Sequence, residues 1–214
     1  MLFRSMNWLK ENTEPDAVIA AWWDYGYWIQ TKAERASLAD NSTIHSTVIE
    51  KIAKMFSSTP DEGWILLNEM DADYVLVFVA GQKLGIDSDE PLYVLEGGGD
   101  ESKKQWFMRI AGEDLSKLLH YDGISGTDYF WENTILGKMI PFTPVTYLNF
   151  DTLQELPFYQ PGFDPVYVKE IKYPSYSNGP LRLVYSSSSF TEENFGPMIA
   201  IFIYEVNKDY KSIS

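Results

Sequence analysis

Residues 18–26 read Val-Ile-Ala-Ala-Trp-Trp-Asp-Tyr-Gly, a short apolar run that ends in a cluster of aromatic side chains around one carboxylate. The part from Val18 to Trp22 has the length and composition of a buried strand. The cluster then lies at the carboxyl end of that strand, where α/β sheets often gather binding groups. The structural alternative is a core strand that runs into a turn, with Gly26 supplying a positive φ or a close backbone approach.

The side chains of the cluster have complementary hydrogen-bonding groups. Each indole N–H of Trp22 and Trp23 is a donor without acceptor capacity, and the ionised carboxylate of Asp24 is an acceptor without a donor. Adjacent residues of an extended segment point to opposite faces, so a packing role needs apolar partners on both sides of an aspartate that resists burial. Together the three side chains can satisfy both sides of a single hydroxyl group.

The string Trp22-Trp23-Asp24-Tyr25-Gly26 resembles the signature of the catalytic subunit of oligosaccharyltransferase, the membrane enzyme that transfers a lipid-linked oligosaccharide to asparagine in Asn-x-Ser/Thr sequons. The flanking residues 6–13, 16–20, 27–29 and 39–41 also resemble that family. Its second signature is an acidic residue, two variable positions, lysine, three variable positions, and Met or Ile. We match it to Glu101, Lys104 and Met108, with Asp100 one position earlier. The resemblance covers roughly residues 5–140.

The resemblance implies the soluble C-terminal domain of an archaeal-type enzyme that spans the membrane many times, with this domain on the extracytoplasmic face. It implies that Trp22 and Trp23 donate to the Ser/Thr hydroxyl of the acceptor polypeptide and that Asp24 accepts from it. In the same way, Met108 covers the threonine methyl group and Lys104 holds Asp24 or Glu101 in place. Tyr25 and Gly26 complete the implied acceptor-binding set.

The chemistry itself is implied for the missing membrane domain. There a divalent metal ion, Mg or Mn, and the lipid-linked oligosaccharide bind, whereas this fragment is expected to hold no cofactor or metal and to contain no catalytic residue. It is therefore expected to have no transferase activity alone.

Composition limits the other functions. The 214 residues are 45% hydrophobic and 15% aromatic, which indicates a globular protein. A net charge of −14 argues against nucleic-acid binding by a broad basic surface. Without cysteine there is neither a disulfide nor a thiolate metal site, and the two histidines, His45 and His120, have no recognised ligand spacing. No apolar stretch approaches the ~20 residues that cross a bilayer.

The pattern predicts a mixed α/β fold, a core of helices and sheet with a small β-rich insertion. Helices are expected at 3–11, 44–56 and 60–70, the last with a capping box from Thr59 to Glu62. A buried strand is expected at 73–80. A flexible break at 97–99 precedes a helix that contains Lys104 and Met108, and helical segments follow at 113–119 and 128–140. We divide the chain into a central α/β core with both motifs at 1–140, a Pro/Tyr-rich insertion at 141–180, and C-terminal strands at 181–214 that return to the core.

Two other functions stay open at this point. Aromatic rings and carboxylates also bind sugars, so an extracytoplasmic glycan-binding, lectin-like module is the main alternative. A purely structural extracytoplasmic domain is the other. Convergence of Trp22, Trp23 and Asp24 near Met108 favours acceptor binding, whereas an exposed aromatic platform elsewhere favours sugar.

Overall fold

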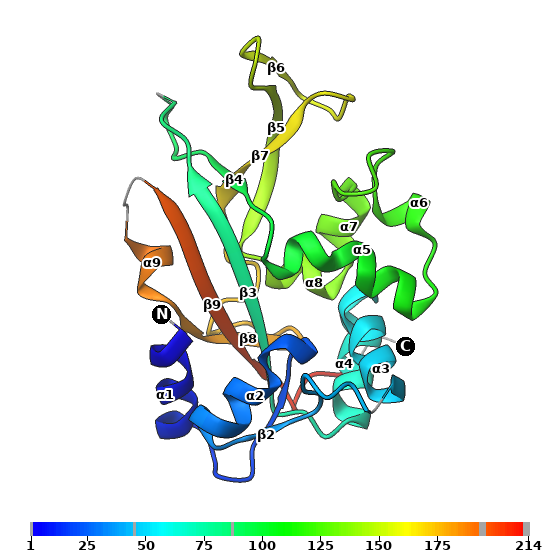
Figure 1. Cartoon of the computed structure of the whole chain (residues 1–214), viewed down its shortest axis with the longest axis vertical. Coiled ribbons are helices and arrows are strands. Elements are labelled where there is room, and N and C mark those ends of the chain that lie inside the picture. The colour runs from blue at the N-terminus through cyan, green and yellow to red at the C-terminus, as the bar shows by residue number, and fades with distance from the viewer. Residues whose placement is uncertain (1, 45, 87, 193–195, 212–214) are drawn as a thin grey trace.

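The computed structural model of the chain describes residues 2–44, 46–86, 88–192 and 196–211. It combines one sheet with helices on both sides, so the expected mixed α/β class is confirmed (Figure 1). None of the helices in these ranges has the length and apolar character needed to cross a lipid bilayer.

The elements follow one another with few long connections. The helical elements are α1 (Leu2–Asn12), the 3₁₀ turn η1 (Trp23–Tyr25), α2 (Gly26–Trp28), the π-helical turn η2 (Ile29–Ala33), α3 (Ser46–Ser57), α4 (Pro60–Glu69), α5 (Asp100–Ala111), α6 (Leu115–Leu118), α7 (Asp128–Asn133), α8 (Ile135–Met139) and α9 (Ser188–Thr191). The strands are β1 (Val18–Ala20), β2 (Ala36–Ser37), β3 (Tyr74–Lys83), β4 (Tyr93–Leu95), β5 (Phe142–Asn149), β6 (Gln154–Leu156), β7 (Asp164–Lys169), β8 (Leu181–Ser186) and β9 (Pro197–Val206).

The sheet is built around β3, the long buried strand. Its order is β2-β1-β3-β4-β7-β5-β6, and β9 pairs with the other edge of β3 and with β8. The β1–β2 and β1–β3 pairs are parallel and the other pairs are antiparallel. The pairing of β3 with β9 runs from Tyr74 opposite Glu205 to Gln82 opposite Pro197. This ladder places the C-terminal strand in the centre of the fold.

Strands β5, β6 and β7 project from the body of the molecule, as Figure 1 shows at its top. They belong to the same sheet, because β7 pairs with β4 through Tyr167 opposite Tyr93. Residues 141–180 therefore extend the central sheet beyond the end of β3.

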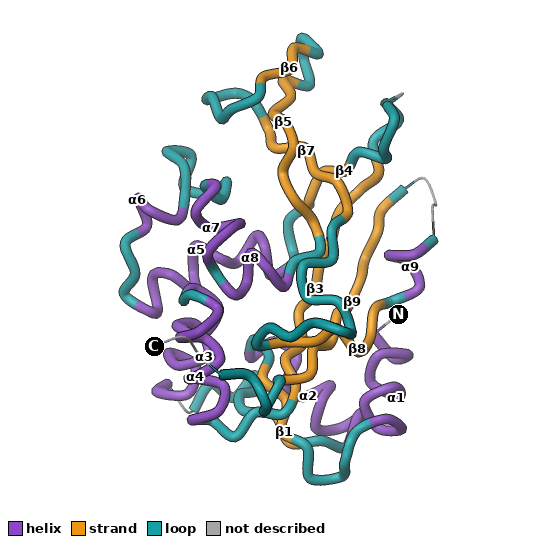
Figure 2. The backbone as a smooth tube through the Cα atoms, turned by 180° about the vertical axis from the view of Figure 1, so that it is seen from behind, coloured by secondary structure: helices purple, strands orange, loops and turns teal. Residues whose placement is uncertain are grey.

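Helices cover the two sides of the β3–β9 pair. In both overall views α1 and α2 lie on one side, and α3 to α8 lie on the other (Figure 2). Helix α3 buries Ile52, Met55 and Phe56, and the Phe56 ring stacks on Phe107 of α5 with centroids 5.1 Å apart. This contact packs α5 against α3.

Local sequence signals explain most helix ends. Thr59 and Glu62 form the expected capping box at the start of α4. The expectation of one helical segment over 128–140 is wrong, because Thr134 adopts an extended conformation and ends α7. Its hydroxyl accepts from Gly137 N–H at 3.0 Å and so caps α8 as a second helix.

Three glycines, residues 97–99, precede α5, and the last of them, Gly99, packs closely against β3. A Cβ on Gly99 would lie 2.9 Å from the backbone nitrogen of Ala80, so the N-terminal end of α5 is pressed against the strand. Only glycine allows this approach. The role expected for residues 97–99, a flexible break, is therefore replaced at Gly99 by a tight contact.

Candidate functional site

The aromatic cluster follows β1 directly, as the sequence predicts. Trp22 is still extended, and Trp23 to Tyr25 then form the single turn η1 before α2. Gly26 has a φ of −54°, so it does not supply a positive φ. A Cβ at this position would lie 2.2 Å from the carbonyl oxygen of Ala39, and the glycine is therefore required by close backbone approach.

The two tryptophans differ in burial. The Trp22 ring is 4% exposed and packs edge-on against Phe107 of α5 with centroids 4.5 Å apart. Trp23 is half-buried, and its ring lies 6.2 Å from that of Trp22. Neither indole N–H has a hydrogen-bond partner among the described residues. Two donors therefore stay unused at the carboxyl end of β1.

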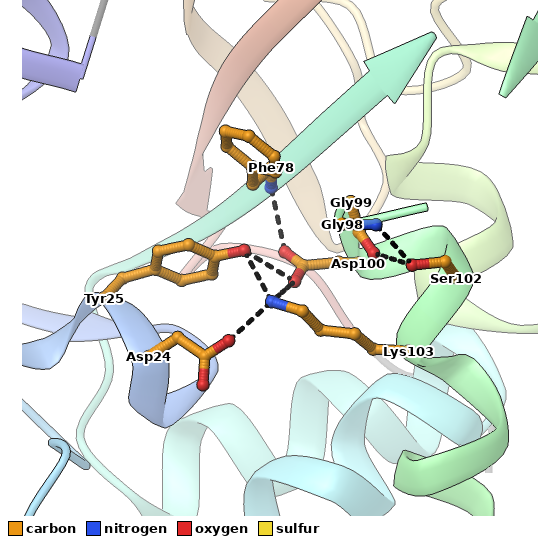
Figure 3. A network of polar contacts seen from close by, with 8 residues as sticks. All are labelled: Asp24, Tyr25, Phe78, Gly98, Gly99, Asp100, Ser102 and Lys103. Carbon is orange, nitrogen blue, oxygen red and sulfur yellow. Dashed lines mark hydrogen bonds and ion pairs between the residues drawn. The ribbon is translucent and has the colours of Figure 1, made fainter. Parts of the chain in front are cut away.

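A polar network joins the cluster to α5 (Figure 3). The Lys103 ammonium donates to Asp24 Oδ2 at 2.7 Å and to the Tyr25 hydroxyl at 3.0 Å. The Tyr25 hydroxyl donates to Asp100 Oδ1 at 3.0 Å, and the Phe78 N–H of β3 donates to Asp100 Oδ2 at 2.8 Å. The other oxygen of Asp24, Oδ1, is buried and has no hydrogen-bond partner within the described part of the chain.

Burial sets the protonation of this network. It raises the pKa of Asp100 to about 6, although Lys103, the Phe78 N–H and the Tyr25 hydroxyl act in the opposite direction. Burial and the neighbouring Asp100 carboxylate raise the pKa of Tyr25 far above its ordinary value, so its hydroxyl stays a donor at neutral pH. The network therefore keeps one acceptor oxygen of Asp24 engaged and leaves the other one unpaired.

Sequence and fold relate the chain to known proteins. No protein-family model matches the chain. The sequence is 31% identical over 190 residues to the dolichyl-diphosphooligosaccharide–protein glycosyltransferase subunit STT3B of Oryza sativa subsp. japonica. The aligned region covers 88% of this chain and 24% of that protein. The sequence is also 30% identical over 207 residues to the STT3 subunit of Dictyostelium discoideum, and this alignment covers 95% of this chain and 26% of that protein.

A solved structure shows the same fold. The C-terminal globular domain of an oligosaccharyltransferase from Archaeoglobus fulgidus matches with a TM-score of 0.50 and 21% identity over 95% of both chains. The chain belongs to the oligosaccharyltransferase family. It spans about a quarter of the length of the curated relatives named above and has the fold of a C-terminal globular domain.

The acid and the lysine that contact the aromatic cluster of this oligosaccharyltransferase domain each lie one residue before the expected position. Asp100 and Lys103 contact the cluster, whereas Lys104 pairs with Glu101 and is 1% exposed. Of the two pairings expected for Lys104, the one with Glu101 is confirmed, and Asp24 is held by Lys103 instead. A shift of one residue turns a side chain by about 100° around a helix, so only one of the two acid–lysine pairs can face the cluster.

Met108 lies on the side of α5 that is shared with Glu101 and Lys104 by helical spacing. It is 1% exposed and belongs to the core of the oligosaccharyltransferase domain, and the α5 ring that packs on Trp22 is that of Phe107. A role of Met108 in covering a threonine methyl group stays a prediction. The sequence offered both pairs, because Asp100 with Lys103 and Glu101 with Lys104 have the same acid–lysine spacing.

Metal binding has no visible basis in the described ranges of this domain. There, no three or more His, Asp or Glu side chains are grouped in a way that could hold a metal ion. His120 stacks on Tyr159 with ring centroids 4.0 Å apart, and His45 lies outside the described residues. The resemblance places the divalent metal in another part of the enzyme, and no chemical step is assigned to such an ion here.

Proposed function

We propose that this domain binds the acceptor polypeptide of an oligosaccharyltransferase through the hydroxyl of the sequon Ser or Thr. The observation that carries the proposal is the set of unused groups on three consecutive residues. Asp24 Oδ1 lacks a donor, and the indole N–H groups of Trp22 and Trp23 lack acceptors, each within the described residues. A hydroxyl donates one proton and accepts through its lone pairs, so it complements this set.

Lys103 prepares Asp24 for this contact. Its ammonium donates to Oδ2 at 2.7 Å, so the orientation of the carboxylate is fixed while Oδ1 is left for the ligand. Tyr25 and Asp100 hold the ammonium from the other side. A buried acceptor without a partner costs about 1–3 kcal/mol, and a bound hydroxyl would remove that cost.

The rest of the reaction belongs to parts of the enzyme outside this chain. We assign the binding of the lipid-linked oligosaccharide and of a divalent Mg or Mn ion to a membrane-embedded part, as the much greater length of the relatives supports. The full-length protein is then a membrane glycosyltransferase with this domain on the extracytoplasmic face. The present chain, incubated with lipid-linked donor, divalent metal and acceptor peptide, is expected to yield no glycopeptide. Product formation would contradict this division.

The glycan-binding alternative gains no specific support from the ring clusters of the described residues. Outside the site, His120, Tyr147 and Tyr159 form an extended group, but their rings pack on one another at 4.0–6.3 Å. Tyr147 is also 6% exposed, so the group offers little free ring surface to a sugar.

The test uses the chain itself and three acceptor peptides that differ at one side chain. We expect ¹⁵N-NMR titration to give tighter binding of a peptide with Thr at the hydroxyl position than of the isosteric Val peptide or the Ala peptide. Asp24→Ala should remove this difference. Loss of a hydrogen bond to a charged group is worth about 1.5–3 kcal/mol, so the Thr peptide should lose roughly ten- to hundredfold in affinity.

Asp16→Ala is the matched control, because Asp16 is an exposed acid four residues before β1 ends. It changes the net charge by the same amount and should leave the Thr preference intact. Equal affinities of the Thr and Val peptides for the wild type, or an unchanged Thr preference in a folded Asp24→Ala variant, would refute the proposal.

A further inference from the structure

Helix α5 carries an exposed apolar stripe that begins at the candidate site. Trp106 and Ile110 follow Lys103 by three and seven residues, so the three side chains lie within about 60° around the helix axis. Trp106 is 54% exposed and Ile110 is 40% exposed, whereas their neighbour Phe107 is buried. We call Lys103, Trp106 and Ile110 the α5 stripe. The Arg109 guanidinium lies 5.5 Å from the Trp106 ring and borders the stripe with a positive charge.

The stripe is continuous with the groups that are proposed to hold the acceptor. Its first member, Lys103, contacts Asp24 directly. With a rise of 1.5 Å per residue, Trp106 lies about 4.5 Å and Ile110 about 10 Å farther along the helix. An extended peptide advances about 3.3 Å per residue. A chain whose Ser or Thr contacts Asp24 can therefore reach Trp106 with its next one or two residues and Ile110 with its third.

The sequon itself decides which flank of the acceptor reaches the stripe. The asparagine lies two residues before the Ser or Thr, and it must reach the part of the enzyme that performs the transfer, outside this chain. The residues before the Ser or Thr are thus directed away from this domain. The residues after it are free to follow α5.

We propose that the α5 stripe binds apolar side chains at the first to third positions after the sequon Ser or Thr, and so gives the enzyme a preference for acceptors with an apolar flank on that side. This inference rests on the proposed function, because it takes the Ser or Thr to be held by Asp24. The apolar surface of Trp106 and Ile110 selects the side chain. Arg109 disfavours a cationic one.

The experiment compares three amidated peptides in ¹⁵N-NMR titrations of the chain. One ends at the sequon Thr, and two continue for three residues with leucine or glutamine at the first and third added positions. The leucine peptide should bind about fivefold more tightly than the glutamine peptide, the ratio expected for half-burial of one leucine side chain. The indole N–H signal of Trp106, assigned by its loss in Trp106→Ser, should shift with the extended leucine peptide and not with the short one.

Trp106→Ser should abolish the advantage of leucine and leave the affinity for the short peptide unchanged. Tyr176→Ser is the matched control, because Tyr176 is an 83% exposed aromatic side chain in the segment between β7 and β8. It should keep the leucine advantage. Thermal unfolding followed by circular dichroism verifies that both variants are folded.

Three outcomes would overturn the inference and leave the proposed function intact, provided that the short Thr peptide still binds better than its Val analogue. They are equal affinities of the leucine and glutamine peptides, a leucine advantage that survives Trp106→Ser, and an equal loss for short and long peptides in Trp106→Ser. The last result would assign the stripe to a contact with another part of the enzyme. Failure of the Thr peptide to exceed the Val peptide would instead refute the proposed function, and the inference with it.

Discussion

Two adjacent lysines of α5 should have separable roles, and replacing each by methionine tests this. Lys103 is partly exposed and binds Asp24, whereas Lys104 is buried and binds Glu101. Methionine keeps most of the aliphatic chain and removes the charge. We expect Lys103→Met to weaken acceptor binding and Lys104→Met to weaken the fold.

The magnitudes follow from burial. The side chains of Lys104 and Glu101 are 1% and 11% exposed, so Lys104→Met leaves an unpaired carboxylate inside the protein and should cost about 3–5 kcal/mol of unfolding free energy. The side chains of Lys103 and Asp24 are 20% and 31% exposed, and water compensates part of the loss. Lys103→Met should therefore cost less, about 1–3 kcal/mol, much of it through the buried Asp100.

Acceptor affinity should show the opposite order. Without Lys103 the Asp24 carboxylate loses its fixed orientation, and we expect about a tenfold weaker affinity for a Thr sequon peptide, which corresponds to about 1.4 kcal/mol. Lys104→Met should leave the affinity of the folded fraction within about twofold. Urea denaturation gives the stabilities, and NMR titration gives the affinities.

One pattern would refute the reasoning. If Lys104→Met impairs peptide affinity and Lys103→Met does not, then Glu101, Lys104 and Met108 form the functional register, as the sequence motif alone suggests. A double-mutant cycle of Lys103→Met with Asp24→Asn adds a direct check, because partners in contact should show a coupling of at least about 0.5 kcal/mol.

Three further changes probe the same site. The pKa of Asp100 is raised to about 6 from 3.8, so the folded state binds a proton that the unfolded state does not hold at this pH. Stability should therefore rise by about 1 kcal/mol as the pH falls from 7 to 5, and this gain is lost again as the pH rises through 6; pH-dependent urea denaturation should lose this component in Asp100→Asn. Tyr25→Phe removes the hydroxyl between Lys103 and Asp100 and should cost about 1–3 kcal/mol in the same assay; a cost near zero would mean that the Lys103–Asp100 contact suffices. Gly26→Ala places a methyl group against the Ala39 carbonyl and should cost at least about 1–3 kcal/mol; near-native stability would show that the loop at 39–40 yields easily.

Much of the local structure could be predicted from the sequence, because its signals act over a few residues. The Thr59–Glu62 capping box forms as expected, and the aromatic cluster lies at the end of β1. Thr134 shows the limit of such reasoning. A threonine can lie inside a helix or cap the start of one, and the tertiary packing of α7 and α8 selects the cap.

The motif at 22–26 by itself indicated the family, through its resemblance to a known signature. It also predicts a hydroxyl as the ligand, because indole donors and a carboxylate acceptor have fixed hydrogen-bonding capacities. It could not decide which acid and which lysine of α5 meet that motif. Asp100 with Lys103 and Glu101 with Lys104 have the same spacing, and the choice depends on the rotation of α5 about its axis. The tertiary structure sets that rotation through the contact of Gly99 with β3 and of Phe107 with Trp22 and Phe56, which are long-range contacts that no local pattern encodes.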